Sequence, residues 1–246
     1  MDGAGSRGAV LVLFDVDGTL LDAGGSGRWA MTRAFEEVFG IADAEPFSRM
    51  VRFEGMTDPT IFRAIAANAS IPETLLEEKS ARIEQSFLGH LEERLSTTSQ
   101  KRALPGVVDL LDRLNGVNLA HVGLLTGNIE RGARLKLAAV GLSRYFEMGG
   151  FGDDAPDRAG IGQVARLRFE ETLGGAIGPS QVVAIGDSVE DIIAARANSY
   201  RSLAVGTGWS GHDALKAQSP DLFLEDLADF GLVMQFIFGS RSTTSG

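Results

Sequence analysis

The feature that most constrains the fold is an unbroken apolar run that leads directly into two acids. Val10–Phe14 is followed by Asp15, Val16, Asp17 and Gly18. A short apolar run bounded by a turn signal is typical of a strand buried on both faces, as in a parallel sheet. Side chains alternate along an extended chain, so Asp15 and Asp17 can project to one side at the strand's carboxyl end. The same residues also suit a strand that enters an acidic hairpin turn, because Asp-Gly favours such turns.

Two carboxylates at one strand end repel each other unless a cation lies between them. Oxygen ligands select hard cations, and Mg²⁺ is usually held by one or two carboxylates together with the phosphate of a substrate. The spacing of Asp15 and Asp17 therefore predicts a Mg²⁺ site beside the first strand.

A helical block follows this strand, over residues 28 to about 98. Its apolar residues first recur at intervals of three and four up to Gly40, where that helix is expected to end. Asp58-Pro59 indicates an N-cap and the first residue of a second helix. A long amphipathic helical segment is expected over Glu73–Leu95. The block contains no strand pattern and predicts a separate small domain, and the glycine-rich stretch Ala23–Gly27 before it is expected to be a hinge.

From Leu104 onward, strand and helix patterns alternate, which is typical of a doubly wound parallel sheet. The expected strands are Leu119–Leu125, Phe146–Gly149, Val182–Ile185, Ser202–Val205 and Leu222–Leu224. The expected helices are Val107–Leu114, Glu130–Ala139, Arg158–Leu173, Val189–Ala197 and His212–Ala217. The first strand has no partner nearby in the sequence, so it is expected to join this later sheet. The prediction is an α/β, Rossmann-like core of residues 1–22 and 104–246, with an inserted helical cap of residues 23–103.

Polar residues also follow two of the later strands. Thr126-Gly127-Asn128 comes after one of them and leads into a helix, so its donors suit an anion. Gly186-Asp187 comes after another, with Asp191 in the first turn of the next helix. Ordinary capping is the alternative for each segment, because Thr, Asn and Asp are common N-caps. Ligands of open α/β sheets bind outside the carboxyl ends of the strands, so all of these residues are expected at one site.

The order of these motifs resembles the haloacid dehalogenase-like hydrolases. Motif I corresponds to Asp15–Thr19, motif II to Thr126–Asn128 and motif IV to Gly186–Asp191. The helical insertion after motif I is similar to the C1-type cap of the phosphoglycolate phosphatase-like members. Within the cap, Gly55–Asp58 resembles their substrate-facing loop, with Met56 where a basic residue is usual.

This resemblance implies a Mg²⁺-dependent phosphatase that hydrolyses a small phosphomonoester through an aspartyl phosphate. Asp15 would be the nucleophile, and Asp17 the general acid and base. Mg²⁺ would be held by Asp15, the backbone carbonyl of Asp17 and Asp187, and Asp191 would orient these ligands or add a contact.

The resemblance also assigns residues to the phosphoryl group. Thr126, Gly127 and Asn128 would bind and stabilise the transferring oxygens. Thr19 is expected to take part in this phosphate site and to hydrogen-bond near Asp17.

The resemblance further leads us to expect a cation, usually a lysine, between motifs II and IV. This chain has no lysine between Lys136 and Lys216. The expected replacement is Arg158, whose guanidinium can bind two phosphate oxygens at once. The alternative is that Arg158 pairs with Asp154 or Asp157 at the start of its helix.

Two other functions fit parts of the pattern. A β-phosphoglucomutase-like phosphomutase shares the motifs, although that group tends to have Val or Ile where Thr19 stands. A non-hydrolytic phospho-aspartate switch also places a phosphorylated Asp in an α/β sheet, but without a helical insertion of this length. Continuous phosphate release separates the hydrolase from the switch.

Charge and composition restrict the partners. The 23 Lys and Arg residues against 33 Asp and Glu give a net charge of −10, which disfavours nucleic acid and anionic membranes. The absence of cysteine excludes a thiol nucleophile and thiolate metal sites. No long apolar run or signal-peptide pattern is present, so a cytoplasmic enzyme is expected. Its partner would be a small phosphorylated metabolite, and it would be a monomer or homodimer.

Overall fold

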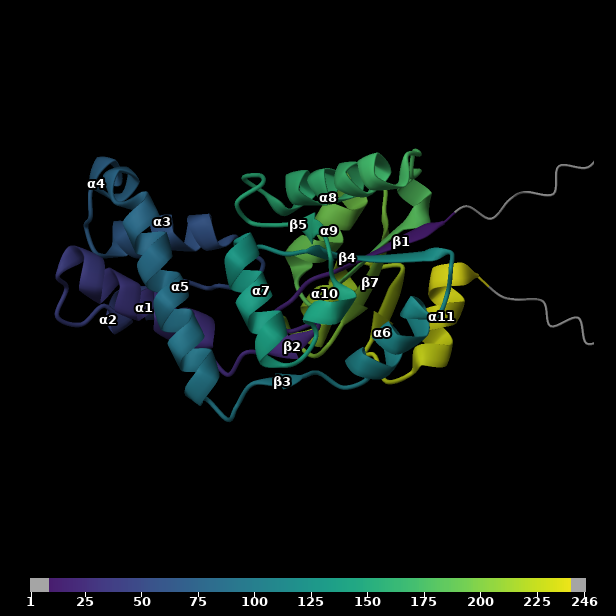
Figure 1. The fold of residues 1–246 in the computed structure, drawn as a ribbon, viewed down its shortest axis with the longest axis horizontal. Coiled ribbons are helices and arrows are strands. Elements are labelled where there is room, and N and C mark those ends of the chain that lie inside the picture. Colours follow the sequence, from purple (N-terminus) through teal and green to yellow (C-terminus); the bar gives the residue numbers. More distant parts are fainter. Residues whose placement is uncertain (1–8, 240–246) are drawn as a thin grey trace, which may run out of the picture.

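A parallel sheet forms the centre of the core, as the alternating pattern predicted. The computed structural model describes residues 9–239, and within them the sheet has six strands in the order β5-β4-β1-β6-β7-β8 (Figure 1). The strands are β1 Val10–Phe14, β4 Ala120–Leu125, β5 Gly149–Gly150, β6 Val182–Gly186, β7 Arg201–Val205 and β8 Leu222–Leu224. The α/β fold class is therefore confirmed.

The first strand lies in the middle of this sheet, between β4 and β6. Phe14 is paired with Leu124 on one side and with Ile185 on the other. The expectation that β1 joins the later strands is thus correct. The predicted strand at Phe146–Gly149 is displaced to Gly149–Gly150, because Phe146 follows a 3₁₀ turn and packs its ring edge-on against Phe14 at 6.1 Å.

Helices cover both faces of the sheet. Leu11 and Leu13 share one apolar cluster with residues of α8 and α9, whereas Val12 and Phe14 share the other with residues of α6 and α11. This alternation is that of a strand buried on both faces. The core helices are α6 Val107–Asn115, α7 Glu130–Ala139, α8 Arg158–Leu173, α9 Val189–Ala197, α10 His212–Ala217 and α11 Phe230–Phe238.

Helix α11 was not among the predicted helices. Its nine residues are almost all apolar, so they carry little of the polar-apolar alternation that marks a surface helix. Asp229 caps it by accepting a hydrogen bond from the backbone N–H of Leu232 at 3.0 Å. None of the helices within residues 9–239 has the length and apolar character that crossing a membrane requires.

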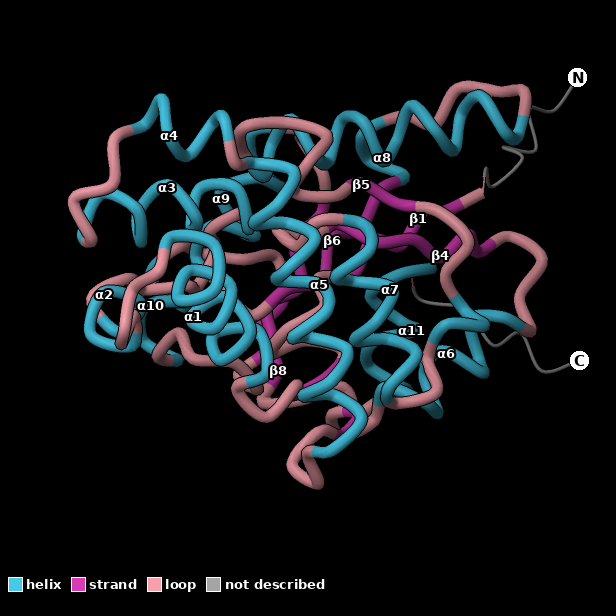
Figure 2. Tube along the Cα trace, turned by 60° about the vertical axis from the view of Figure 1, so that its left-hand side comes forward, coloured by secondary structure: helices cyan, strands magenta, loops and turns pink. Residues whose placement is uncertain are grey.

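The cap consists of helices, as predicted, but its segmentation differs (Figure 2). The helices are α1 Ser26–Phe39, α2 Glu45–Arg49, α3 Asp58–Asn68, α4 Glu73–Glu78 and α5 Ser80–Thr97. The helical segment expected over Glu73–Leu95 forms two helices, because the chain breaks at Lys79, which ends α4 and precedes α5. The predicted N-cap Asp58 is wrong, since the hydroxyl of Thr57 accepts the bond from the N–H of Thr60 at 3.3 Å.

A two-stranded antiparallel ribbon joins the cap to the core. It pairs β2 Leu21–Asp22 with β3 Arg102–Ala103. The guanidinium of Arg102 lies 2.9 Å from the carboxylate of Asp22. The ribbon lies at the two predicted boundaries of the cap, and the hinge predicted at Ala23–Gly27 follows directly after it.

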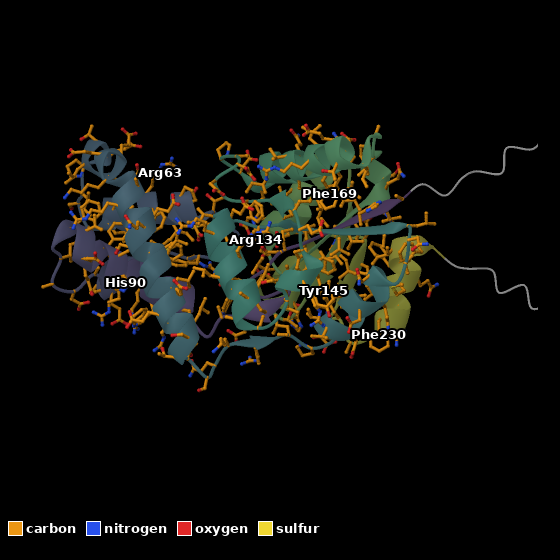
Figure 3. The ribbon with its side chains drawn as sticks, viewed as in Figure 1. Arg63, His90, Arg134, Tyr145, Phe169 and Phe230 are labelled. Atoms are coloured by element: carbon orange, nitrogen blue, oxygen red, sulfur yellow. The ribbon has the colours of Figure 1, made fainter. Side chains whose placement is uncertain are left out.

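Close packing of α8 on the sheet predicts a stability difference between two glycine substitutions. A Cβ atom at Gly123 would lie 2.5 Å from the ring of Phe169 (Figure 3), whereas Gly89 on α5 has no atom within 4 Å. We expect Gly123→Ala to lower the free energy of unfolding by about 1–3 kcal/mol, because the core is overpacked. Gly89→Ala should raise it by up to about 1 kcal/mol, through helix propensity.

Urea denaturation of the two variants beside the wild type measures both effects. Equal stability of the two variants would contradict the packing described for α8.

Candidate active site

Parallel register brings the ends of three strands to one level. Phe14 pairs with Leu124 and Ile185, and the N–H of Asp15 donates to the carbonyl of Ile185 at 2.9 Å. The residues that follow these strands therefore emerge along the same edge of the sheet. All three sequence motifs lie there, as expected from the resemblance.

Three carboxylates from two of these segments form a buried cluster. Asp15, Asp187 and Asp191 each place an oxygen within 4.8 Å of the others. Burial raises the pKa of Asp15 to about 6. Burial also raises the pKa of Asp187 well above its ordinary value, and the two neighbouring carboxylates add to the effect. Such a cluster is electrostatically unfavourable without nearby positive charge.

Arg158 provides part of that charge. Its Nη1 atom lies 2.8 Å from Oδ1 of Asp191 and 3.0 Å from Oδ1 of Asp15. Burial lowers the pKa of Arg158, but the two carboxylates outweigh burial and raise it. The alternative pairing with Asp154 is wrong, because Asp154 pairs with Arg168 at 2.6 Å. Arg158 thus lies beside these carboxylates at this edge of the sheet.

The free oxygen of Asp15 and the space around the Asp187 carboxylate fit a divalent cation. Oδ1 of Asp15 is buried, and no hydrogen-bond donor within the described residues is aligned with it, since Arg158 approaches off-axis. A Cβ atom at Gly18 would lie 2.5 Å from Oδ2 of Asp187, and one at Gly208 would overlap the same carboxylate. The glycines thus leave room around Asp187. An all-oxygen donor set of this kind suits Mg²⁺.

Thr19 lies in the site, next to one carboxylate of the cluster. Its buried hydroxyl donates to Oδ1 of Asp187 at 3.0 Å. Gly18 has a positive φ of 83°, so the chain turns sharply after Asp17. Thr19 therefore fixes one carboxylate of the buried cluster.

Asp17 belongs to a second polar cluster. Its Oδ2 atom accepts hydrogen bonds from Nδ2 of Asn128 at 2.8 Å and from Nζ of Lys136 at 2.5 Å. Lys136 also donates to Oδ1 of Asn128 at 2.5 Å. The hydroxyl of Thr126 accepts from Nδ2 of Asn128 at 2.8 Å, which joins motif II to this cluster.

Lys136 is the site residue that sequence reasoning missed. It lies on α7, nearly two turns beyond Ile129, among the buried residues of that helix. Burial lowers its pKa, but the carboxylates of Asp17 and Asp58 outweigh burial and raise it, so Lys136 is a cation. A lysine on the buried stripe of a helix that follows motif II was the available signal, because buried lysines are rare unless paired.

The loop Gly55–Asp58 of the cap touches the core. The N–H of Asp58 donates to the carbonyl of Gly127 at 2.7 Å, and Oδ2 of Asp58 accepts from the N–H of Ile129 at 2.9 Å. Nε of Arg158 donates to the carbonyl of Gly55 at 3.4 Å. A Cβ atom at Gly127 would overlap the carbonyl of Met56, so only glycine permits this approach.

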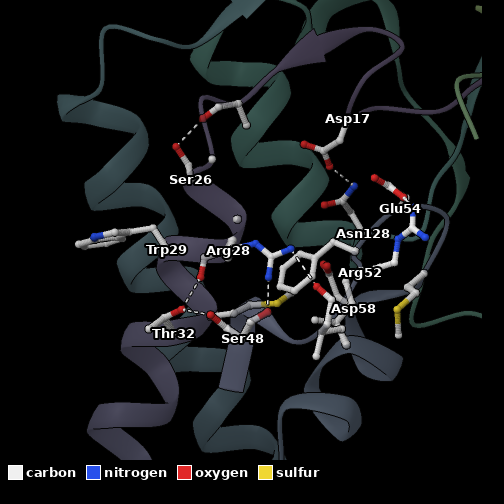
Figure 4. A pocket seen from close by; sticks show the side chains of 18 of the residues that line it. Asp17, Ser26, Arg28, Trp29, Thr32, Ser48, Arg52, Glu54, Asp58 and Asn128 are labelled. Atoms are coloured by element: carbon white, nitrogen blue, oxygen red, sulfur yellow. Dashed lines mark hydrogen bonds and ion pairs between the residues drawn. The ribbon is translucent and has the colours of Figure 1, made fainter. Parts of the chain in front are cut away.

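Cap and core together enclose a cavity of about 1020 Å³ (Figure 4). Asp15, Asp17 and Asn128 line its core side, and Met56 and residues of α1 and α2 line its cap side. The volume suits a small molecule. Chemically, the site combines two carboxylates on one strand end, two buried cations and a helix N-terminus, which together suit transfer of an anionic group.

Comparison with known proteins identifies the family. Residues 10–198 match the family model of the haloacid dehalogenase-like hydrolases. Phosphoglycolate phosphatase 1 of Pseudomonas aeruginosa is 28% identical, over 89% of this chain and 77% of its own length. Phosphoglycolate phosphatase of Agrobacterium fabrum is also 28% identical, over 89% of both chains. The crystal structure of CbbY from Rhodobacter sphaeroides in complex with phosphate has the same fold, with a TM-score of 0.69 and 19% identity over 91% of this chain and 96% of that one.

The contact between cap and core predicts a pH-dependent stability. Burial raises the pKa of Asp58 from 3.8 to about 6, and Lys136 and the N–H of Ile129 offset this only in part. The folded protein therefore holds this proton more tightly than the unfolded chain, and the resulting stability is lost as the pH rises through about 6. Asp58→Asn keeps an acceptor for Ile129 without the charge. Its stability relative to wild type should rise by roughly 2 kcal/mol between pH 4.5 and pH 8.

Urea unfolding of both proteins at the two pH values measures this difference. Asp109→Asn, at an exposed carboxyl of α6, is the matched control. Parallel pH curves for wild type and Asp58→Asn would contradict the assignment.

Proposed function

This chain belongs to the haloacid dehalogenase-like hydrolases and is a phosphatase of that family, and we propose that it hydrolyses a small phosphomonoester through an aspartyl phosphate on Asp15. The observation that carries the proposal is the buried carboxylate of Asp15, which has one oxygen beside Arg158 without an aligned donor and faces the cavity. The relatives named phosphoglycolate phosphatase support a small substrate.

In the first step, a carboxylate oxygen of Asp15 attacks phosphorus and the bond from phosphorus to the ester oxygen breaks. Asp17 gives a proton to the departing alkoxide. In the second step, Asp17 takes a proton from water, whose oxygen attacks the same phosphorus. The bond from phosphorus to Asp15 then breaks, which releases phosphate, restores the carboxylate of Asp15 and leaves Asp17 protonated for the next cycle.

Lys136 and Asn128 position Asp17 for both proton transfers. Their donors meet on one oxygen of Asp17, so the other oxygen is left for the substrate. A fixed carboxylate loses little freedom when the reacting group arrives. Lys136 is therefore proposed as a positioning residue.

The transferring oxygens face several donors. Arg158 stands beside Asp15, and the N-terminus of α7 follows Gly127. The Thr126 hydroxyl accepts two hydrogen bonds from Asn128, which leaves its own hydrogen for a phosphoryl oxygen. Such donors stabilise charge that develops in the transition state.

Mg²⁺ is the proposed cofactor, held by Asp15, Asp187 and the backbone carbonyl of Asp17. When bound, it neutralises charge on the phosphoryl group. Both oxygens of Asp191 are already occupied, one by Arg158 and one by the N–H and hydroxyl of Ser188 at 3.0 and 2.6 Å. Asp191 is therefore proposed to orient the ligands and not to bind the metal directly.

Loss of the nucleophile should abolish turnover. We expect the wild type to release phosphate continuously from p-nitrophenyl phosphate in the presence of Mg²⁺ and not after chelation. Asp15→Asn should show no measurable release, because uncatalysed phosphate-monoester hydrolysis is extremely slow.

The same assay, repeated with a sugar monophosphate, separates the competing functions. A single turnover per chain would indicate a phospho-aspartate switch, and transfer between two sugar hydroxyls without net release would indicate a phosphomutase. Either result would overturn the proposed hydrolysis.

Removal of the buried lysine should affect the chemical step more than substrate binding. Lys136→Met leaves Asp17 without its shortest contact, so we expect kcat to fall by about 10²-fold with a smaller change in KM. Lys216→Met, at an exposed lysine of α10, is the control. An effect confined to KM would show that Lys136 binds substrate instead.

A further inference from the structure

Trp209 is an aromatic residue on the cavity wall whose ring has no partner. It follows β7 in a glycine-rich loop and lines the cavity together with Asp15 and Asp187. The residue is 61% exposed, and none of the described residues hydrogen-bonds to its indole or places a ring or a cation against it. Single exposed apolar residues are ordinary on a protein surface. This one differs because it faces the cavity in which the reaction is proposed.

The loop holds Trp209 beside the buried carboxylates. The hydroxyl of Thr207 donates to the carbonyl of Gly18 at 2.6 Å, which ties the loop to the turn after β1. A Cβ atom at Gly208 would overlap the carboxylate of Asp187, so the backbone of the loop packs directly on that group. Consecutive Cα atoms are about 3.8 Å apart, so Trp209 begins one short step from this contact. Its indole is thus anchored close to the proposed reacting centre.

The two other aromatic rings on the described cavity wall are covered by arginines. The guanidinium carbon of Arg94 lies 5.5 Å from the ring centroid of Trp29, and that of Arg28 lies 3.8 Å from the ring centroid of Phe53. Trp29 also lies apart from the core residues that are labelled in Figure 4. Trp209 therefore offers the free aromatic face of this wall.

The rest of the cavity wall favours an uncharged leaving group. Met56 lines the cavity from the cap, and a Cβ atom at Gly127 would overlap its carbonyl, so this residue stands directly over motif II. A thioether is polarizable and makes favourable contacts with aromatic rings. The described residues of the wall include eight acids and seven bases, so the wall has no excess of positive charge for a further anion.

We propose that Trp209 stacks on an aromatic ring of the leaving group, so that the enzyme prefers phosphomonoesters of alcohols that carry an aromatic ring close to the ester oxygen. This inference rests on the proposed function and names the substrate class of that site. Aromatic pairs favour offset or edge-on packing, and the free face and edge of the indole allow both. Trp209 is a specificity-determining residue and takes no part in the bond-making steps.

Two ring esters of similar size test the stacking. Benzyl phosphate and cyclohexylmethyl phosphate are both esters of primary alcohols, but only the first has an aromatic ring. Burial of apolar surface alone does not favour the benzyl ester, because the saturated ring is at least as apolar. We expect the wild type to favour benzyl phosphate over cyclohexylmethyl phosphate by about 2- to 10-fold in kcat/KM, mainly through KM.

Variants of Trp209 assign this preference to the indole. Trp209→Leu keeps an apolar side chain without the flat ring and should remove the preference for the benzyl ester. Trp209→Phe should retain most of it. Both variants should turn over ethyl phosphate almost as the wild type does, because that ester is too short to reach the indole. Met50→Ala is the matched control, since Met50 is 70% exposed but is not among the cavity-lining residues.

Three results would overturn the proposal. The wild type could treat the two ring esters alike, or it could favour 2-phosphoglycolate over benzyl phosphate. Equal losses on all three alkyl and ring esters in Trp209→Leu would show that Trp209 only supports the loop.

Binding of phosphonates separates this inference from the proposed hydrolysis. Benzylphosphonate and cyclohexylmethylphosphonate lack the ester oxygen, so calorimetry with Mg²⁺ should show tighter binding of the aromatic compound, and Trp209→Leu should abolish the difference. The chain has two tryptophans, so in Trp29→Phe the remaining indole emission reports on Trp209 and should change when benzylphosphonate binds. Failure of the phosphatase proposal would appear as no phosphate release from any ester. Failure of the stacking would appear as equal binding of both phosphonates with unchanged emission.

Discussion

The site depends on the balance between buried carboxylates and buried cations at one edge of the sheet. Asp15, Asp187 and Asp191 lie together with Arg158, and Asp17 lies with Lys136. Breaking a buried ion pair typically costs about 3–5 kcal/mol, because the remaining charge stays desolvated. The two cations are therefore also needed for stability, because without them the buried carboxylates would be unpaired charges. This requirement explains why a charged site can exist at the end of an entirely apolar strand.

The central position of β1 makes this balance possible. The strand is paired on both sides, and the backbone N–H of Asp15 itself donates to Ile185 on β6. Asp15 is thereby fixed by the sheet and not by a mobile loop. The chain leaves the sheet immediately afterwards, at Gly18, and the cap is inserted between β1 and its neighbour β4. One strand thus positions the proposed nucleophile and also carries the connection to the cap.

Sequence patterns predicted those parts of the protein that depend on local chemistry. The apolar runs and the polar residues after Phe14, Leu125 and Gly186 sufficed for the sheet and for the edge at which the site lies. They did not suffice for pairwise contacts: Lys136 was missed because its partner Asp17 is 119 residues away in the chain. Sequence analysis also missed two local features that apolar periodicity does not mark. These are the break between α4 and α5 and the almost wholly apolar helix α11.

The cap shares contacts with the residues of the proposed phosphoryl site. Gly127 and Arg158, which are proposed to meet the phosphoryl group, are also the core residues that touch the backbone of the Gly55–Asp58 loop. A ligand that displaces this loop would therefore break its contacts with Gly127 and Arg158. A ligand that leaves the loop in place would keep both contacts.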